Sequence, residues 1–159
     1  MSGSAAKTVE LGRGSIREAV PADAQALADL SAQLGYPVPA DEMAERLQAL
    51  LADPRHEVFV WQAETGQVLG FLHLFRSLYL EAPPMAEIGG LVVDAGARGR
   101  GIGARLVARG ERWALAHGLV RIRVRSRLER ADAHRFYDRL GYSRFKQQQV
   151  FLKDLDPSA

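Results

Sequence analysis

The amino-acid sequence predicts one mixed α/β domain, for three reasons. Its 159 residues are 47% hydrophobic and 25% charged, which is typical of a globular domain with a core of its own. Strand-like and helix-like periodicities follow one another in the order β-α-α-β-β-β-α-β-α-β-β. No internal repeat or linker interrupts this order. We therefore expect a domain over residues 14–156, preceded by a flexible tail over residues 1–13 that shows no periodicity.

The composition argues against several classes of protein. The sequence contains no cysteine, which excludes disulfides and thiolate metal sites, and we expect no metal centre. No apolar run approaches the roughly 20 residues that are needed to span a bilayer. We therefore expect a cytoplasmic protein that makes no contact with a membrane.

The first half of the chain contains two expected helices and three expected strands. Pro21 is typical of the first turn of a helix, whereas Pro37 cannot continue one and ends it. Residues 64–67 are expected to form a hairpin turn, and the prolines of residues 81–84 to break the strand before them. The expected elements are a strand at 15–20, helices at 21–35 and 41–52, and strands at 57–63 and 68–80.

The second half begins with a strand, a glycine-rich turn and a helix. The strand is expected at residues 87–94, where Gly89 and Gly90 suit a bulge, the close approach of a ligand, or simply tight packing. An amphipathic helix is expected from Ala104 to His117. The remaining elements are a strand at 120–126, a helix at 131–140 and a closing pair of strands at 142–148 and 150–155.

The turn Arg98-Gly99-Arg100-Gly101-Ile102-Gly103 is the strongest functional signal. A glycine-rich turn before a helix leaves backbone N–H groups unpaired at the positive end of the helix dipole, which is typical of a phosphate site. A Walker-type loop is excluded, because Ala104 and Arg105 stand where Lys and Ser or Thr are required. A dinucleotide site is disfavoured, because the next strand ends in Ser126 and Arg127 instead of an acidic residue.

Two motifs in the chain identify a family. Arg98, Gly101 and Gly103 match the pattern Arg-x-x-Gly-x-Gly/Ala at the head of a helix, and Phe136-Tyr137-x-x-Leu140-Gly141-Tyr142 is a second signature downstream. From about Ile16 to Phe151, the chain resembles the GNAT superfamily of acetyl-coenzyme A-dependent N-acetyltransferases. The resemblance implies a single-domain α/β fold with a mixed, mostly antiparallel central sheet flanked by helices.

The resemblance also implies where acetyl-coenzyme A, the co-substrate, binds. The loop amides are expected to hold the pyrophosphate, and the pantetheine arm to run beside the strand before the loop. Arg127 and Arg130 stand where many members carry asparagines that reach the coenzyme. The expected cofactor residues are Leu91, Val92, Val93, Arg98, Gly99, Arg100, Gly101, Ile102, Gly103, Ala104, Arg130, His134 and Tyr137.

Acetyl transfer to an amine requires three steps that the protein can assist. The amine must lose a proton, the tetrahedral oxyanion must be stabilised, and the departing thiolate must be protonated. The resemblance gives the acid to Tyr137, since a phenol with a pKa of about 10 is protonated at neutral pH, and the oxyanion to a backbone N–H near Leu91. It assigns the role of general base to Glu87, which is expected to be basic because its neighbours are apolar. Two alternatives stay open: Glu87 only attracts the amine, or His73 is the base.

The distribution of charge indicates what the acceptor is. Residues 1–97 carry 6 Lys and Arg against 13 Asp and Glu, a balance of −7, whereas residues 98–159 carry 15 against 6, a balance of +9. This favours an anionic ligand on the second half and a cationic one on the first. We therefore expect direct attack, in a ternary complex, by a primary amine of a small cationic molecule or a peptide. The expected acceptor residues are Tyr36, Glu87 and Gln149.

The sequence leaves several alternatives open. The acceptor is an aminoglycoside, a polyamine or a lysine side chain, and the sequence does not choose among them. A second hypothesis is a catalytically weak module that senses acyl-coenzyme A or binds a protein partner. A nucleic-acid-binding module is disfavoured, because Trp113, Phe136 and Tyr142 are expected in the core instead of on a basic surface. A homodimer is compatible with the family.

Overall fold

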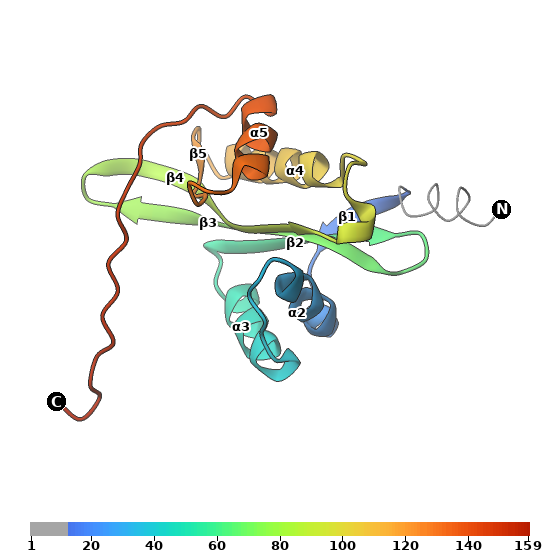
Figure 1. Ribbon diagram of the computed structural model, residues 1–159, viewed down its shortest axis with the longest axis horizontal. Helices are drawn as coiled ribbons and strands as arrows, with labels where there is room; N and C mark the ends of the chain where they lie inside the picture. Colours follow the sequence, from blue (N-terminus) through green and yellow to red (C-terminus); the bar gives the residue numbers. More distant parts are fainter. Residues whose placement is uncertain (1–12) are drawn as a thin grey trace. The chain divides into compact units, whose positions relative to one another are not determined.

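The computed structural model describes residues 13–159, so the expected tail lies outside the described residues except for Arg13. The chain divides after Arg125 into two compact units, residues 1–125 and Ser126–Ala159. Figure 1 shows the elements of each unit. The single domain expected over residues 14–156 stays a prediction.

A five-stranded sheet forms the centre of the first unit (Figure 1). The strands are neighbours in chain order, with three antiparallel pairs from β1 to β4 and a parallel pair between β4 and β5. This confirms the expected mixed, mostly antiparallel sheet. The strands are β1 (Gly14–Glu18), β2 (His56–Ala63), β3 (Val68–Tyr79), β4 (Ala82–Val93) and β5 (Ile122–Val124).

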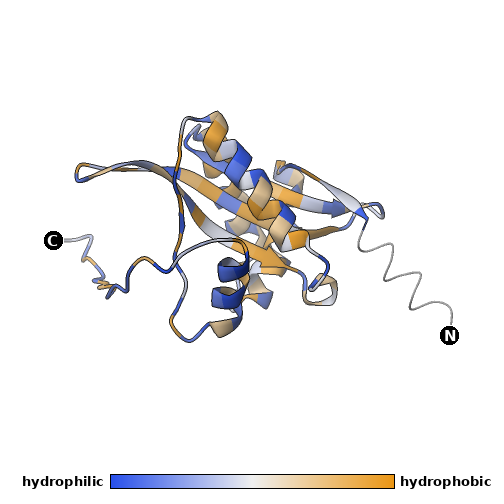
Figure 2. Cartoon of the chain, turned by 90° about the horizontal axis from the view of Figure 1, so that it is seen from above, coloured by the Kyte–Doolittle hydropathy of each residue, from blue (hydrophilic) through white to orange (hydrophobic). Residues whose placement is uncertain are grey.

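Helices cover both faces of this sheet, with α2 and α3 on one face and α4 on the other (Figure 1). Hydrophobic residues predominate on the strands between them, whereas the helices are of mixed character (Figure 2). The helical elements of the first unit are the 3-10 turns η1 (Pro21–Asp23) and η2 (Ala95–Ala97) and the helices α2 (Ala24–Gln33), α3 (Ala40–Ala52) and α4 (Ile102–Ala116).

The core of the first unit has one part on each face of the sheet. On the face of α2 and α3, Val60 of β2 and Leu47 of α3 are buried in one cluster. On the opposite face, Leu72 and Leu74 of β3 are fully buried beneath α4. Gly110 permits this packing, because a Cβ at this position would lie 2.7 Å from Leu72 Cδ2. The helix that follows the glycine-rich turn is therefore packed closely on the centre of the sheet.

The hairpin between β3 and β4 differs from the prediction. A break was expected at residues 81–84, but the turn falls at Leu80 and Glu81, and Pro83 and Pro84 lie within β4. The pairing of β3 with β4 is irregular here, since its register shifts between Ser77 and Tyr79. A residue without an N–H group is tolerated in a strand at such an irregularity, which explains why the prolines do not end it.

The strand that follows α4 is shorter than expected. It was expected over residues 120–126, but β5 covers Ile122–Val124 and pairs with Ala86–Ile88 of β4. Immediately after this pairing, β4 has a bulge at Gly89, where the register with β3 shifts. A bulge bends the strand, which explains why the parallel pairing stops there.

The second unit contains one helix, α5 (Ala131–Arg139), among its described residues. The closing strands expected at 142–148 and 150–155 are not formed in the structure. Strands require backbone partners and gain stability by burying one face, whereas Phe145, Phe151 and Leu152 are each more than 80% exposed. Alternating sequence alone was therefore an insufficient signal at this end of the chain.

Two features are absent from the described residues. No helix among residues 13–159 combines the length and apolar character that a bilayer span requires. Within the same residues, no group of three or more metal-ligating side chains is gathered in one place.

Candidate active site

The glycine-rich turn joins β4 to α4 through two residues in the left-handed backbone region. Gly99 has φ +77° and Gly101 has φ +79°, and a side chain at either position would be strained. Gly101 is the N-cap of α4, and its carbonyl accepts the first helical hydrogen bond, from Arg105 N at 3.0 Å. The glycines thus bring the chain directly from the loop into the first turn of the helix.

The first turn of α4 presents backbone donors to the loop. The N–H groups of Ile102, Gly103 and Ala104 have no acceptor within the helix, as in every helical first turn. No described residue supplies a side-chain cap at Gly101. These donors lie at the positive end of the helix dipole, so the geometry suits an anionic group such as a phosphate. Nearby, exposed Arg98 folds back, and its Nε donates to Val93 O at 3.1 Å.

Gln33 at the end of α2 fixes the start of this loop. Its Nε2 donates to Asp94 Oδ1 at 2.8 Å, and its Oε1 accepts from Ala95 N at 2.9 Å. Asp94 in turn caps η2 by accepting from Gly96 N at 2.9 Å. Sequence reasoning missed this positioning role, because a glutamine 61 residues before its partner gives no local signal.

The segment Leu91–Val93 of β4 has an open edge. Strand β5 pairs with β4 only as far as Ile88, so the described residues provide no neighbouring strand beside Leu91 on that side. Val92 is buried, whereas Leu91 and Val93 are half-buried. An extended ligand with amide groups can therefore run along this edge, as expected for the pantetheine arm.

Glu87 lies in surroundings that the sequence did not predict. Its buried carboxylate accepts from Arg123 Nη2 at 2.6 Å and lies 3.2 Å from Arg125 Nε. Both arginines also donate to the Tyr79 hydroxyl, at 3.1 and 3.4 Å. The expectation of apolar neighbours was therefore wrong: Arg123 of β5 and Arg125, which follows β5, both contact Glu87. The carboxylate of Glu87 thus already has two charged partners.

His73 of β3 lies beside the bulge of β4. Its Nε2 is 2.9 Å from His56 Nδ1, and the two rings stack at 5.2 Å. Burial, with a smaller effect of His56, lowers the pKa of His73 to about 4, so its imidazole is neutral at pH 7. A Cβ at Gly89 would lie 2.6 Å from His73 Nδ1, so glycine makes this approach possible. Of the alternatives left open for Gly89, the structure shows both a bulge and tight packing.

In the second unit, Tyr137 lies on α5 and is half-buried between two aromatic rings. Phe136 and Tyr142 contact it edge-on, with ring centroids 5.0 and 5.4 Å away. Burial raises the pKa of Tyr137 to about 12, opposed by the charge of Arg130. Its phenol is therefore protonated throughout the neutral and mildly alkaline range, as an acid must be.

The other expected site residues are more exposed. His134 Nε2 lies 2.9 Å from Arg127 O, so this ring is already engaged within the second unit. Tyr36, in the segment after α2, is 49% exposed. Gln149 is exposed in the C-terminal segment, and Arg130 is exposed at the N-cap of α5. The roles of these four residues stay predictions.

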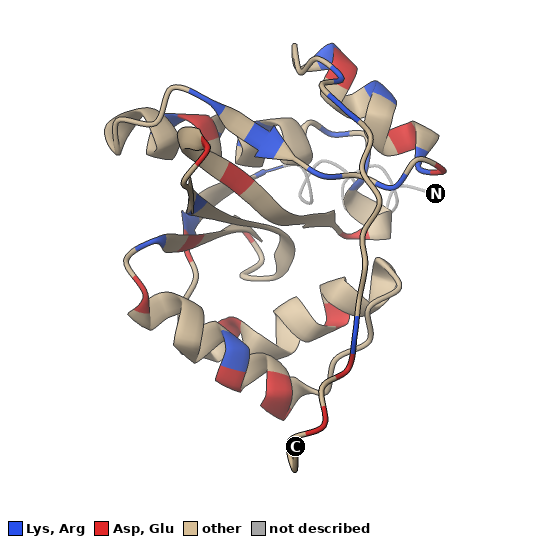
Figure 3. Cartoon of the chain, turned by 90° about the vertical axis from the view of Figure 1, so that its left-hand side faces the viewer, with Lys and Arg blue, Asp and Glu red and all other residues tan. Residues whose placement is uncertain are grey.

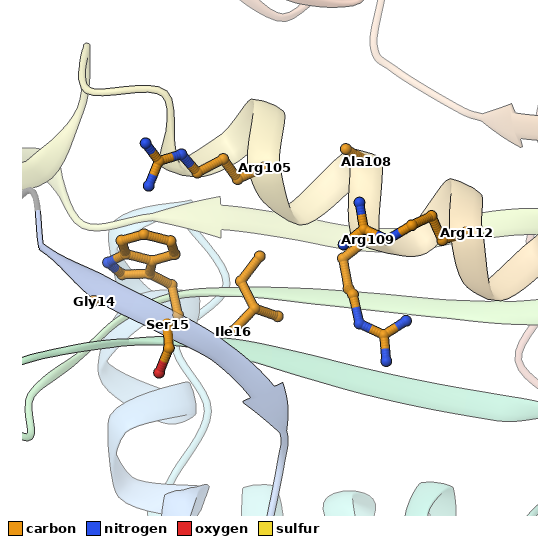
Figure 4. A pocket seen from close by; sticks show the side chains of 8 residues that line it. Gly14, Ser15, Ile16, Arg105, Ala108, Arg109 and Arg112 are labelled. Carbon is orange, nitrogen blue, oxygen red and sulfur yellow. The ribbon is translucent and has the colours of Figure 1, made fainter.

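A basic pocket lies between β1 and α4, on the face of the sheet opposite α2 and α3 (Figure 4). It has a volume of about 410 Å³ and is lined by Arg105, Arg109 and Arg112. Arg105 lies over the ring of Trp61 and Arg109 over that of Phe59, so both guanidinium groups cover the sheet. None of the expected site residues lines this pocket.

Comparisons with known proteins support the interpretation of this site as that of an acetyltransferase. The acetyltransferase (GNAT) family matches residues 24–142. Aminoglycoside N(6')-acetyltransferase type 1 of Stenotrophomonas maltophilia is 33% identical over 148 residues, which cover 91% of this chain and 95% of the relative. Aminoalkylphosphonate N-acetyltransferase of Salmonella typhimurium is 38% identical over 78 residues, 48% of this chain and 51% of the relative.

Solved structures share the fold. Aminoglycoside 6'-N-acetyltransferase AAC(6')-Ih of Acinetobacter baumannii has a TM-score of 0.80 at 19% identity, with 90% of this chain and 99% of that chain covered. AAC(6')-Iy in complex with coenzyme A has a TM-score of 0.81 at 20% identity, with 90% and 96% covered. The open edge and the helix N-terminus fit the coenzyme. The chain belongs to the GNAT family and is an N-acetyltransferase that uses acetyl-coenzyme A.

Proposed function

We propose that this enzyme acetylates the 6'-amine of an aminoglycoside. The observation that carries the proposal is the similarity to the Stenotrophomonas maltophilia relative over nearly the full length of both chains. A second relative of the same name, from Serratia marcescens, is 27% identical over 74% of this chain and 82% of its own length. An aminoglycoside is a small polycation, which agrees with the acceptor expected from the charge distribution.

The acidic surface of α2 and α3 supports a cationic acceptor. Figure 3 shows acidic residues on these two helices, which cover one face of the sheet. Asp29 lies on α2, and Asp41, Glu42 and Glu45 lie on α3, all four of them exposed. Among these residues, Glu42 makes an ion pair with Arg46 at 3.5 Å, in which both side chains are more than half exposed. This surface attracts a polyamine before it reaches the reacting centre.

The reaction proceeds by direct attack of the amine on the thioester, which acetyl-coenzyme A supplies. A backbone N–H near Leu91 on the open edge of β4 stabilises the oxyanion. Tyr137 gives its proton to the departing thiolate, and its raised pKa keeps that proton available. Glu87, which pairs with Arg123 and Arg125, either takes the proton of the amine or only attracts the amine, and His73 is its rival as base.

The test is release of coenzyme A thiol across a panel of amines. The panel contains aminoglycosides, spermidine, a lysine peptide and an aminoalkylphosphonate. We expect turnover with the aminoglycosides and little with the others. Preferential turnover of the aminoalkylphosphonate would contradict the proposal and would point to the arginines of β5 as an anion site. Stabilisation by acetyl-coenzyme A without thiol release from any amine would instead support the sensor hypothesis.

Replacement of Gly101 by Ala is expected to weaken acetyl-coenzyme A binding about tenfold. A side chain at φ +79° costs about 1–2 kcal/mol, and the loop relieves this strain by moving its N–H groups. Titration calorimetry measures the effect. The matched control is Gly118→Ala at the other end of α4, where φ is +73° and a Cβ also meets nothing within 4 Å. Equal weakening in both variants would contradict a specific role of the loop.

Replacement of Gln33 by Ala is expected to raise the KM for acetyl-coenzyme A about fivefold. The variant loses both hydrogen bonds that fix the start of the loop, each worth about 1 kcal/mol, and water replaces part of this loss. The value of kcat should change little. The control is Gln25→Ala on the same helix, since Gln25 donates only to exposed Asp29. An unchanged KM in Gln33→Ala would show that the loop keeps its conformation without α2.

The quaternary structure and the location in the cell stay predictions. A homodimer is tested by sedimentation of the purified protein, and the cytoplasmic location by fractionation of cells that express it.

A further inference from the structure

The proposed function names His73 only as a rival base to Glu87, and it gives no role to His56, whose ring stacks on that of His73. The two imidazoles come from neighbouring strands and face each other on the side of the sheet covered by α2 and α3. Their nitrogens, His56 Nδ1 and His73 Nε2, lie 2.9 Å apart, which is a hydrogen-bond distance. Phe75 stacks on both rings, at 5.1 and 5.7 Å, and fixes their orientation.

The pair continues towards the protein surface through Asp53. His56 Nε2, the nitrogen that does not face His73, lies 3.9 Å from Asp53 Oδ2. Asp53 is held in place by Arg55, whose Nη2 and Nε donate to its two oxygens at 2.8 and 3.1 Å. This contact lowers the pKa of Asp53 to about 2, so its carboxylate is ionised at neutral pH. The series of polar groups from His73 through His56 to Asp53 therefore ends at the surface in a fixed negative charge.

At its other end, this series of groups reaches the bulge of β4 through His73. His73 Nδ1 is the nitrogen that faces Gly89, which is exposed, and a Cβ at Gly89 would occupy the space next to it. Gly89 lies two residues before Leu91, whose surroundings provide the proposed oxyanion donor. It also lies two residues after Glu87, whose carboxylate is already engaged by arginines. The space next to Gly89 therefore borders a ring nitrogen, and an amine that enters this space meets His73 Nδ1.

We propose that His73 and His56 form a proton relay that takes the proton from the attacking amine to the surface. This inference rests on the proposed acetyl transfer. As the C–N bond forms, the amine N–H bond breaks and His73 Nδ1 gains the proton. His73 Nε2 gives its own proton to His56 Nδ1, and His56 Nε2 gives its proton to water beside Asp53. Both rings end as the opposite neutral tautomer and return through exchange with solvent.

The surroundings of His73 favour passing the proton on to His56 over keeping it on the His73 ring. Burial and the neighbouring imidazole hold His73 in its neutral form, so a charge on this ring is short-lived. The charged groups around the pair are Asp53 and Arg55 behind His56, and, on β4, Glu87 with Arg123 and Arg125. His73 is then the catalytic residue, since it meets the amine, and His56 is the positioning residue that acts through it.

The test compares His73→Ala, His56→Gln and Gly89→Ala with the wild-type enzyme on the best acceptor of the panel. We expect His73→Ala to lower kcat at least tenfold with little change in acetyl-coenzyme A affinity, and added imidazole to restore part of it. Gly89→Ala keeps both histidines but fills the space at Nδ1, so it should also lower kcat. The wild-type solvent isotope effect should depend nonlinearly on the deuterium fraction, and His56→Gln should make it linear. His117→Gln, an exposed histidine on the last turn of α4, is the control.

The outcomes separate the relay from the proposed function. Wild-type kcat and pH dependence in both His73→Ala and Gly89→Ala would overturn the relay while leaving acetyl transfer intact. No thiol release by the wild-type enzyme with any amine would overturn the proposed function itself. If His73→Ala does not fold, Gly89→Ala together with the isotope effect of His56→Gln decides the matter.

Discussion

Replacement of Tyr137 by Phe is expected to lower kcat by about 10² to 10³. The change removes one hydroxyl and leaves the ring that packs between Phe136 and Tyr142. General acid catalysis typically contributes about 10² to 10⁴, and water replaces part of it in the variant. Because the pKa of Tyr137 is about 12, the wild-type acid should stay protonated as the pH rises to about 10. Steady-state kinetics from pH 6 to 10 measures both effects.

The control for this variant is Tyr142→Phe, which removes a hydroxyl from the neighbouring ring of the same unit. It should keep kcat within about twofold, since Tyr142 has no assigned part in the reaction. Acetyl-coenzyme A affinity should be close to wild type in both variants. Equal kcat in Tyr137→Phe and the wild-type enzyme would remove Tyr137 from the mechanism.

Replacement of Glu87 by Ala is expected to destabilise the fold by about 2–3 kcal/mol. The side chain of Glu87 is 7% exposed and that of Arg123 is 21% exposed, so the variant leaves a largely buried guanidinium without its counter-charge. Arg123 Nε is already buried without a hydrogen-bond partner among the described residues, which makes this loss harder to compensate. For a chain of this size the change corresponds to a fall in Tm of roughly 4–12 °C.

Glu42→Ala is the matched control, because it breaks an ion pair with Arg46 in which both side chains are more than half exposed. Such a pair contributes at most about 1 kcal/mol, so Tm should fall by roughly 4 °C or less. Thermal unfolding of the two variants in parallel gives the comparison. A Glu87→Ala protein as stable as Glu42→Ala would show that the arginines of β5 find other partners.

The local features of the fold could be predicted from residues that allow few conformations. A turn was expected at residues 64–67 and a helix end at His117, and the glycines there, Gly66 and Gly118, adopt positive φ, at +90° and +73°. Gly101 was expected in the anion-binding turn for the same reason and also has positive φ. A glycine between two periodic segments thus gives a reliable boundary, because other residues rarely adopt this backbone region.

The contacts across the sheet could not be predicted in the same way. Arg123 meets Glu87 only because β5 is parallel to β4 in one particular register, and register is decided by the whole sheet. The contact of His56 with His73 likewise depends on the pairing of β2 with β3. A period of two residues indicates a strand but not its neighbour. The arginine-rich alternation at 121–125 was the available signal for the ion pairs, since it placed charge on one side of the last strand.

The most direct test of the account is the acetylation of two aminoglycosides that differ only at the 6' position. One carries an amine there and the other a hydroxyl, and both are incubated with the enzyme and acetyl-coenzyme A. Mass spectrometry with fragmentation then locates any added acetyl group. The account predicts one acetyl group on the 6'-amine and no product from the hydroxyl compound. Acetylation of both compounds at another amine, or of neither, would contradict it.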